Sequence, residues 1–303
     1  MNFGIMIDTN KPIDKIVSTL DGYQKAGIDN FWVSQIFGYD SLTLIGILSQ
    51  HLKDANFGTA VVPIQPKHPF AMALQAMTVS ASMSKEFTLG IGLSHKMVIE
   101  NIYGLDFSNP ATQMEEYLVI LNGLISGNGS TYNGEHYNVS FAGKLEIKLD
   151  NHPKIIVAAL GTKMLQIAGR LSDGTATWMT GPATLKSHIV PTILQAAQEA
   201  GKTETQIIAG LPVCVTDNPS GAKNMAAEVF SIYGSLPSYR SMLDKENAQG
   251  PEDVAIIGSA QEVEQRLMEI KAIGATKFIG GLFGTKEEIE NTAGLLGELN
   301  SKV

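Results

Sequence analysis

The feature that most constrains the fold of this 303-residue chain is a regular alternation of short apolar strands with helix-forming segments. Phe3 to Asp8 has the pattern of a strand, and Pro12 opens a helix whose apolar residues recur at helical spacing as far as Leu20. The same pair of elements recurs along the chain. The strands that we expect lie at 3–8, 30–34, 56–62, 86–92, 154–158, 175–178, 206–215 and 277–280.

Strands that alternate with helices predict an α/β fold with a parallel sheet covered by helices. Eight such units in a chain of this length favour a closed (β/α)8 TIM barrel, with an open doubly wound sheet as the alternative. Two segments depart from the repeat. Residues 126–153 predict an inserted hairpin, and residues 236–258, longer than a usual connection, predict a long loop or helical insertion before the last strand. We treat residues 1–303 as a single TIM-barrel domain.

Composition narrows the range of partners. The formal net charge is −8, without a dense block of Lys and Arg, which argues against nucleic acid or an anionic membrane and favours a small-molecule substrate. No apolar run is long enough to span a membrane, and the first residues lack a basic leader, so we expect a cytoplasmic protein. The single cysteine, Cys214, excludes an internal disulfide, and the six histidines lack the spacing of a metal site.

The active site of a barrel collects at the carboxyl ends of its strands. The fourth expected strand ends in Ser94 and His95, and a histidine there is placed to move or orient a proton; a structural wall histidine is the alternative. Residues 92–96 resemble a nucleophile elbow, but Lys96 stands where the turn needs glycine, so a serine hydrolase is a weak alternative. Gly90-Ile91-Gly92 also lacks the third glycine of a dinucleotide-binding turn.

A second strand end carries an anion-binding pattern. In the stretch VAALGTKMLQIAG, residues 157–169, a strand leads through Gly161 into a helix that begins near Lys163. Backbone amides at a helix N-terminus bind anions, and here the phosphate of a cofactor is the candidate. The alternative is a turn that simply requires glycine.

Taken together, these strand ends resemble the luciferase-like flavin and deazaflavin oxidoreductases, specifically their coenzyme F420-dependent branch. The resemblance covers residues 31 to 243 and rests on several ungapped stretches. They are FWVSQIFGYDSLT, GTAVVPIQPKHP, FTLGIGLSH, IVAALGTKMLQIAGRLSDGTATWMTGP, GSLPSYRSMLD and AGLPVCVTD. It implies a homodimeric α/β barrel that holds a redox ring at its mouth.

The resemblance also implies which residues bind the cofactor. A cis peptide bond between Ala60 and Val61 would back the ring, and Ser94 would present a polar atom to it. The turn Ala159-Leu160-Gly161-Thr162 would hold the phosphate, and the next strand end would complete that pocket with Trp178, Met179, Thr180 and Gly181. We interpret Gly90 and Gly92 as positions where the backbone approaches the flat ring.

The chain departs from the glucose 6-phosphate-oxidising branch of that family at two strand ends. That branch has a histidine and a glutamate where this sequence has Gln35 and His95. Gln35 is neutral, so we expect it to orient substrate, while His95 is the group suited to proton transfer near neutral pH. Arg240, in the long insertion, would grip the anionic tail of the cofactor or an acidic substrate.

The sequence therefore predicts an oxidoreductase that transfers a hydride between coenzyme F420 and a small organic substrate. An FMN-dependent luciferase-like monooxygenase is the nearest alternative. A flavin-binding protein without turnover is the alternative from another class.

Overall fold

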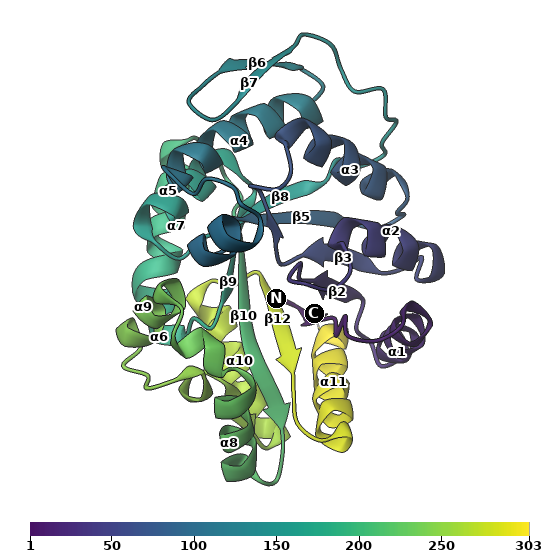
Figure 1. Ribbon diagram of the computed structural model, residues 1–303. Helices are drawn as coiled ribbons and strands as arrows, with labels where there is room; N and C mark the ends of the chain where they lie inside the picture. The colour runs from purple at the N-terminus through teal and green to yellow at the C-terminus, as the bar shows by residue number, and fades with distance from the viewer. Residues whose placement is uncertain (303) are drawn as a thin grey trace.

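A computed structural model describes residues 1–302 of the chain and contains a closed barrel of eight parallel strands (Figure 1). Each barrel strand pairs with the next, and the last strand pairs with the first, which closes the ring. The predicted (β/α)8 TIM barrel is confirmed. Its strands are β1 (Asn2–Met6), β2 (Asn30–Val33), β3 (Asn56–Thr59), β5 (Phe87–Gly92), β8 (Lys154–Ala158), β9 (Gly174–Trp178), β10 (Gln206–Val215) and β12 (Lys277–Leu282).

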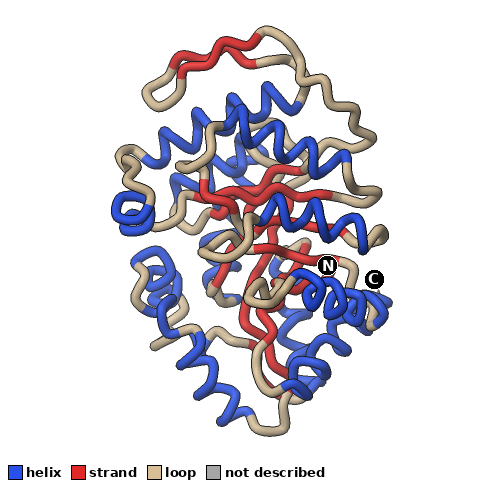
Figure 2. Tube along the Cα trace, turned by 45° about the vertical axis from the view of Figure 1, so that its right-hand side comes forward, coloured by secondary structure: helices blue, strands red, loops and turns tan. Residues whose placement is uncertain are grey.

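Helices form an outer layer around these strands, as the tube view shows (Figure 2). Local capping defines where several of them begin: the Asp40 side chain accepts the Thr43 N–H, and Ser259 and Thr285 each form a reciprocal capping box. The main helices are α1 (Ile13–Lys25), α2 (Ser41–His51), α3 (Pro69–Ala81), α4 (Pro110–Ile125), α5 (Thr162–Leu171), α7 (Val190–Glu199), α8 (Pro219–Val229), α10 (Ala260–Ile273) and α11 (Lys286–Ser301). None of the helices in residues 1–302 is both long enough and apolar enough to cross a bilayer.

The interior of the barrel is packed with side chains. Trp32, Ile156, Ile208 and Ile279 form a buried cluster contributed by four strands. Gly58 makes room for the indole of Trp32, because a Cβ there would lie 2.3 Å from the ring. The barrel is therefore a solid core, and ligands are restricted to its ends.

The predicted hairpin is present as β6 (Ser130–Asn133) and β7 (Asn138–Phe141), which pair antiparallel beyond α4 (Figure 1). Its turn is attached to α4 through Glu116, whose side chain is buried. The Glu116 carboxylate accepts the backbone N–H groups of Glu135 at 2.7 Å, His136 at 2.9 Å and Tyr137 at 3.1 Å. A carboxylate that accepts three backbone donors is a strong, directional anchor for the hairpin.

The segment expected as a long loop or helical insertion at 236–258 is folded and largely helical. It contains α9 (Pro237–Lys245), the short helical turn η4 (Pro251–Asp253) and strand β11 (Ile256–Gly258), and the turn η3 (Ser231–Gly234) precedes it. Strand β11 pairs with the end of β10. We call residues 231–258 the mouth insertion. Neither β11 nor α10 was identified from the sequence.

Three further short elements lie at strand ends. The turn η1 (Val98–Ile102) follows β5, and α6 (Pro182–Thr184) with the turn η2 (Leu185–Ile189) follows β9. The third expected strand, 56–62, was predicted wrongly as continuous. It stops at Thr59 and resumes as β4 (Val62–Pro63).

Replacing Glu116 with alanine removes the acceptor of three hairpin N–H groups. We expect a loss of unfolding free energy on the order of 2–4 kcal/mol, because unpaired backbone donors are costly. Urea denaturation measures this loss, and amide exchange at residues 135–137 should accelerate. Glu116→Gln keeps one acceptor oxygen, so its unfolding free energy should lie between those of the wild type and the alanine variant. Unchanged exchange at these three amides in the alanine variant would contradict the anchor.

Candidate active site

The end of β3 carries a one-residue bulge. Gly58 pairs with Thr88 and Val62 pairs with Ile91, so three residues oppose two on β5. Within this bulge the Ala60–Val61 peptide bond is cis, as the family resemblance implied. The Thr59 hydroxyl donates to the Gly90 carbonyl at 2.7 Å and accepts the Gly90 N–H at 2.8 Å. These two hydrogen bonds replace the backbone pairing with β5 that the bulge interrupts.

The bulge explains both glycines of FTLGIGLSH. A Cβ at Gly90 would lie 1.9 Å from the Thr59 carbonyl oxygen, and one at Gly92 would lie 2.7 Å from a Val61 methyl group. Our interpretation that these glycines admit a flat ring was therefore wrong, because they face the bulged strand instead. Ala60 and Val61 are half-buried at the barrel end.

Ser94 and His95 follow β5 at the rim of the barrel. Ser94 has a left-handed backbone with φ 58°, a conformation that non-glycine residues adopt rarely. His95 is half-buried, and this burial lowers the pKa of its imidazole below the ordinary value, so the ring is neutral at pH 7. Within residues 1–302 no histidine hydrogen-bonds the Ser94 hydroxyl, so these contacts give no support to a serine hydrolase.

Helix α5 begins with an open N-terminus beside β8. Gly161, its N-cap, has an extended backbone and no side-chain cap, and no protein atom lies within 4 Å of where its Cβ would be. Thr162 and Lys163 are exposed next to it. The Leu160 carbonyl oxygen lies 2.8 Å from His188 Nε2, which supports the turn from behind. The free amides, the empty space and the lysine suit a phosphate.

The helix N-terminus that follows β9, at the start of α6, is already occupied by a carboxylate of the protein. The Glu246 carboxylate, from the mouth insertion, accepts the N–H groups of Ala183 at 2.9 Å and Thr184 at 2.8 Å, together with the Thr184 hydroxyl. Met179 has a left-handed backbone with φ 54°, and the Thr180 hydroxyl donates to the Trp178 carbonyl. Of these two helix starts, only that of α5 is left for an anionic ligand.

Gln35 and Arg240 both have partners inside the protein. Gln35 Oε1 accepts the N–H and the hydroxyl of Ser41 at the start of α2, which leaves its amide Nε2 as a donor. Arg240 donates to the Asp244 carboxylate and to the carbonyls of Ala248 and Gln249. Arg240 thus ties the mouth insertion together, and these contacts give no support to its expected grip on a ligand.

A series of aromatic rings was missed from the sequence. The ring of His95 lies 6.0 Å from that of Tyr239, Tyr239 lies 5.1 Å from Tyr233, and Tyr233 lies 6.1 Å from Trp178. We call these four residues the aromatic series. Within the described residues the buried Trp178 indole N–H makes no well-aligned hydrogen bond, although the Tyr233 hydroxyl lies close to it. The sequence analysis assigns a role to Arg240 in the stretch GSLPSYRSMLD but none to the neighbouring Tyr239.

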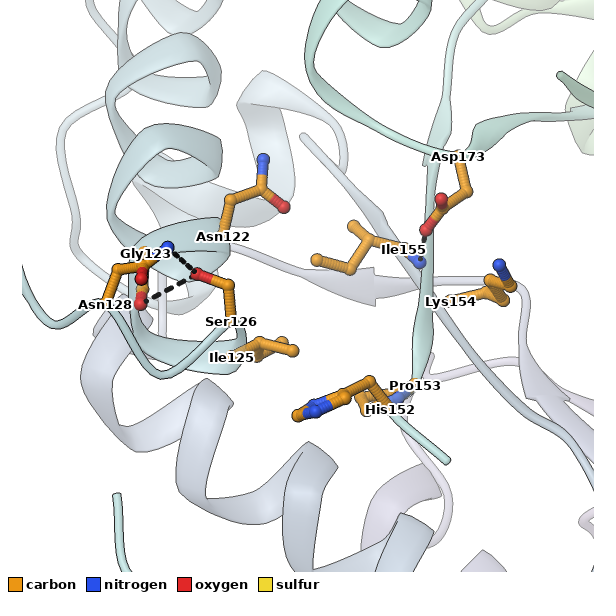
Figure 3. Close-up of a pocket in the computed structure, with 10 residues that line it drawn as sticks. All are labelled: Asn122, Gly123, Ile125, Ser126, Asn128, His152, Pro153, Lys154, Ile155 and Asp173. Atoms are coloured by element: carbon orange, nitrogen blue, oxygen red, sulfur yellow. Dashed lines mark hydrogen bonds between the residues drawn. The ribbon is translucent and has the colours of Figure 1, made fainter. Parts of the chain in front are cut away.

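A separate cavity of about 580 Å³ lies at the opposite end of the strands (Figure 3). His152 to Ile155 at the start of β8 and the last turn of α4 line it. The Asp173 carboxylate, also on its wall, accepts the Ile155 N–H at 2.7 Å. This cavity is remote in the fold from the carboxyl ends of the strands, where barrels carry their chemistry.

A closed (β/α)8 barrel with a bulged strand end and an open helix N-terminus at the same rim defines a TIM-barrel protein with one site at its carboxyl end. The model of the luciferase-like monooxygenase family matches residues 1–277. The chain belongs to this family.

One relative and two solved structures illustrate the likeness. A 5,10-methylenetetrahydromethanopterin reductase from Methanolobus tindarius is 22% identical over 93% of this chain and 94% of its own length. The structure of a coenzyme F420-dependent tetrahydromethanopterin reductase from Methanopyrus kandleri superposes with a TM-score of 0.82 at 18% identity, covering 98% and 97% of the two chains. The oxygenating constituent of 3,6-diketocamphane monooxygenase from Pseudomonas putida, in complex with FMN, gives 0.77 at 16% identity over 98% and 97%.

Burial of His95 predicts a pH dependence. Because its pKa is lowered in the folded chain, the unfolded chain binds more protons between that lowered value and about 6.5. The free energy of unfolding should therefore fall as the pH falls through this window. Titration of the imidazole resonances by NMR, with His95→Gln for assignment, measures the pKa. A value at or above that of an ordinary histidine would contradict the burial.

Proposed function

We propose that this protein is a coenzyme F420-dependent oxidoreductase that transfers a hydride between the deazaflavin and a small organic substrate. The observation that carries the proposal is the open N-terminus of α5 at Gly161, on the same barrel rim as the bulged Ala60–Val61 segment. The Methanopyrus kandleri reductase is named as coenzyme F420-dependent, which supports F420 over other cofactors. A homodimer and a cytoplasmic location, expected from the sequence, remain part of this proposal.

The residues at the rim suit a cofactor of this shape. The amides of Gly161 and Thr162 would hold its phosphate, with Ala159 and Leu160 shaping the turn and Lys163 compensating the charge. The residues that would flank the ring and complete the pocket are Ala60, Val61, Ser94, Trp178, Met179, Thr180 and Gly181. When bound, the deazaflavin supplies the position that gives or accepts the hydride.

The protein's own part in the reaction is then small. His95, neutral at pH 7, would accept the proton released when a substrate is oxidised; in the reverse direction the ring would first take a proton from solvent and then donate it to the substrate. The free amide of Gln35 would orient the substrate from the neighbouring side of the rim, since its oxygen is held by Ser41. The mouth insertion would limit the access of water.

An FMN-dependent monooxygenase is the second candidate. The name of the family and the FMN-bound 3,6-diketocamphane monooxygenase structure favour it, since a similar barrel there holds FMN. Both cofactors carry a phosphate and a flat ring, so the helix start at Gly161 suits either. Titration of the purified protein with F420 and, separately, with FMN shows which cofactor it binds and so distinguishes the two candidate functions.

Gly161→Ala tests the phosphate position. A Cβ there meets no protein atom, so the substitution should leave folding intact but intrude on a bound phosphate. We expect deazaflavin affinity to fall by about tenfold, or about 1.4 kcal/mol, measured by the fluorescence of the cofactor. Gly294→Ala, on α11 with equally open space, is the matched control. Micromolar FMN binding without deazaflavin binding would instead favour the monooxygenase.

His95→Ala tests the proton role. With any ketone or enone that the wild-type protein reduces, we expect turnover to fall by about a hundredfold or more while deazaflavin affinity is retained. Stopped-flow absorbance of the cofactor measures hydride transfer directly. Unchanged turnover would remove His95 from the reaction. Cofactor binding by the wild-type protein, without reduction of any such compound, would favour a flavin-binding protein without turnover.

A further inference from the structure

The aromatic series crosses the mouth of the barrel. It starts at His95, beyond the end of β5, and passes through Tyr239 and Tyr233 to Trp178 at the end of β9. The Trp178 indole then extends over β12, because a Cβ at Gly281 would lie 2.6 Å from it. In the closed strand order β5 and β12 are on opposite sides of the ring. The series therefore forms one continuous aromatic wall across the site.

This wall is held in place by polar anchors. Glu246 fastens the end of α9 to the start of α6, and Arg240 binds the carbonyls of Ala248 and Gln249. The Lys223–Asp253 ion pair, at 2.8 Å, joins the mouth insertion to α8. Since the two tyrosines lie on this anchored segment, their rings are fixed before a ligand arrives.

Charged groups around the mouth are largely neutralised by partners inside the protein. In residues 1–302 these pairs are Asp8–Lys11 at 3.3 Å, Asp40–Lys67 at 2.7 Å and Lys96–Glu100 at 3.7 Å, besides the anchors of Arg240 and Glu246. Lys163 is exposed at α5, where the proposed function gives it to the cofactor phosphate, and exposed Asp217 would repel an anion. Lys186 on η2 and Lys245 at the end of α9 are exposed as well. However, no Lys or Arg in residues 1–302 shifts the pKa of His95, Tyr233 or Tyr239, so an anionic substrate held against these rings would meet no cation there.

The wall nevertheless offers polar groups that can hydrogen-bond an uncharged polar atom of a ligand. Within residues 1–302 the buried Trp178 N–H makes no well-aligned hydrogen bond, although the Tyr233 hydroxyl lies close to it. Such a donor gains free energy when a ligand oxygen accepts from it. His95 is neutral at pH 7 and has no charged neighbour that shifts its pKa. The approach is apolar, because the loops after β2 and β5 expose Ile36 at 60%, Phe37 at 69% and Met97 at 63%.

From these contacts we infer the substrate class: an uncharged, largely apolar flat molecule with a carbonyl group, bound against His95, Tyr239, Tyr233 and Trp178. This inference rests on the proposed function and names the substrate side of that site. Offset or edge-to-face stacking on the two tyrosines would hold the flat part. The carbonyl oxygen would accept a hydrogen bond from the wall. Sugar phosphates and carboxylates would be excluded by the lack of a partner charge.

A matched pair of probes tests the class. Acetophenone and benzoate have nearly the same flat shape, but only benzoate is charged. We expect the protein, in the presence of deazaflavin, to bind acetophenone at least about tenfold more tightly, measured by ligand-observed NMR titration. Benzoate binding as tight as acetophenone binding would overturn the inference, and so would an absence of acetophenone binding up to its solubility limit.

Variants locate the binding site on the wall. Tyr239→Leu keeps apolar bulk but removes the ring, so we expect acetophenone affinity to fall by about tenfold with benzoate unchanged. Tyr239→Phe should restore it. Tyr132→Leu, the same change on the distant hairpin, should have no effect. Equal acetophenone affinity in wild type and Tyr239→Leu, with unchanged thermal unfolding, would overturn the assignment to the wall.

The deazaflavin dissociation constant, measured on the same samples, distinguishes a failure of the substrate class from a failure of the cofactor assignment. Deazaflavin binding with no preference for acetophenone would mean that the substrate class alone is wrong. A preference for acetophenone in a protein that does not bind deazaflavin would mean that the cofactor assignment is wrong while the uncharged wall stands. A protein that neither binds deazaflavin nor prefers acetophenone would contradict both proposals.

Discussion

The extra residue between Gly58 and Val62 is the constraint on which the mouth of this barrel depends. Because it displaces the backbone toward β5, that strand tolerates no side chain at Gly90, where a Cβ would strike the Thr59 carbonyl. The Thr59 hydroxyl hydrogen-bonds both the carbonyl and the N–H of Gly90, in place of the backbone pairing that the bulge interrupts. With the two strands locked together, β5 delivers Ser94 and His95 to the rim beside Ala60 and Val61.

Both insertions are attached by the same physical device. A carboxylate, Glu116 in one case and Glu246 in the other, accepts two or three backbone N–H groups from a distant segment. Such charge-assisted bonds hold a loop without a large apolar interface. The second attachment also shapes the site, because Glu246 occupies the helix start after β9. Of the two helix starts at this rim, the one at Gly161 has no such side-chain cap.

A mouth of this kind suits chemistry that a cofactor performs. The rim offers a neutral imidazole, a free amide on Gln35 and aromatic surface, with few unpaired charges. Such groups can orient a substrate, move a proton and exclude water, which is the part that a protein supplies when a cofactor performs the redox step. Solved structures with a similar barrel are an F420-dependent reductase in one case and an FMN-bound monooxygenase in another, so the side chains at the mouth, and not the fold, distinguish one activity from another.

By itself the sequence determined the eight strand–helix units, the hairpin and the strand ends that carry His95 and Gly161. These features follow from local periodicity and capping, which neighbouring residues decide. Only the tertiary structure showed that Gly90 faces a bulge, that Arg240 serves the insertion, and that β11 and α10 complete the connection from β10 to β12. Tyr239 against His95 and Glu246 against Thr184 join residues more than sixty positions apart. No local pattern encodes such contacts, because they arise only when the barrel closes and brings its strand ends together.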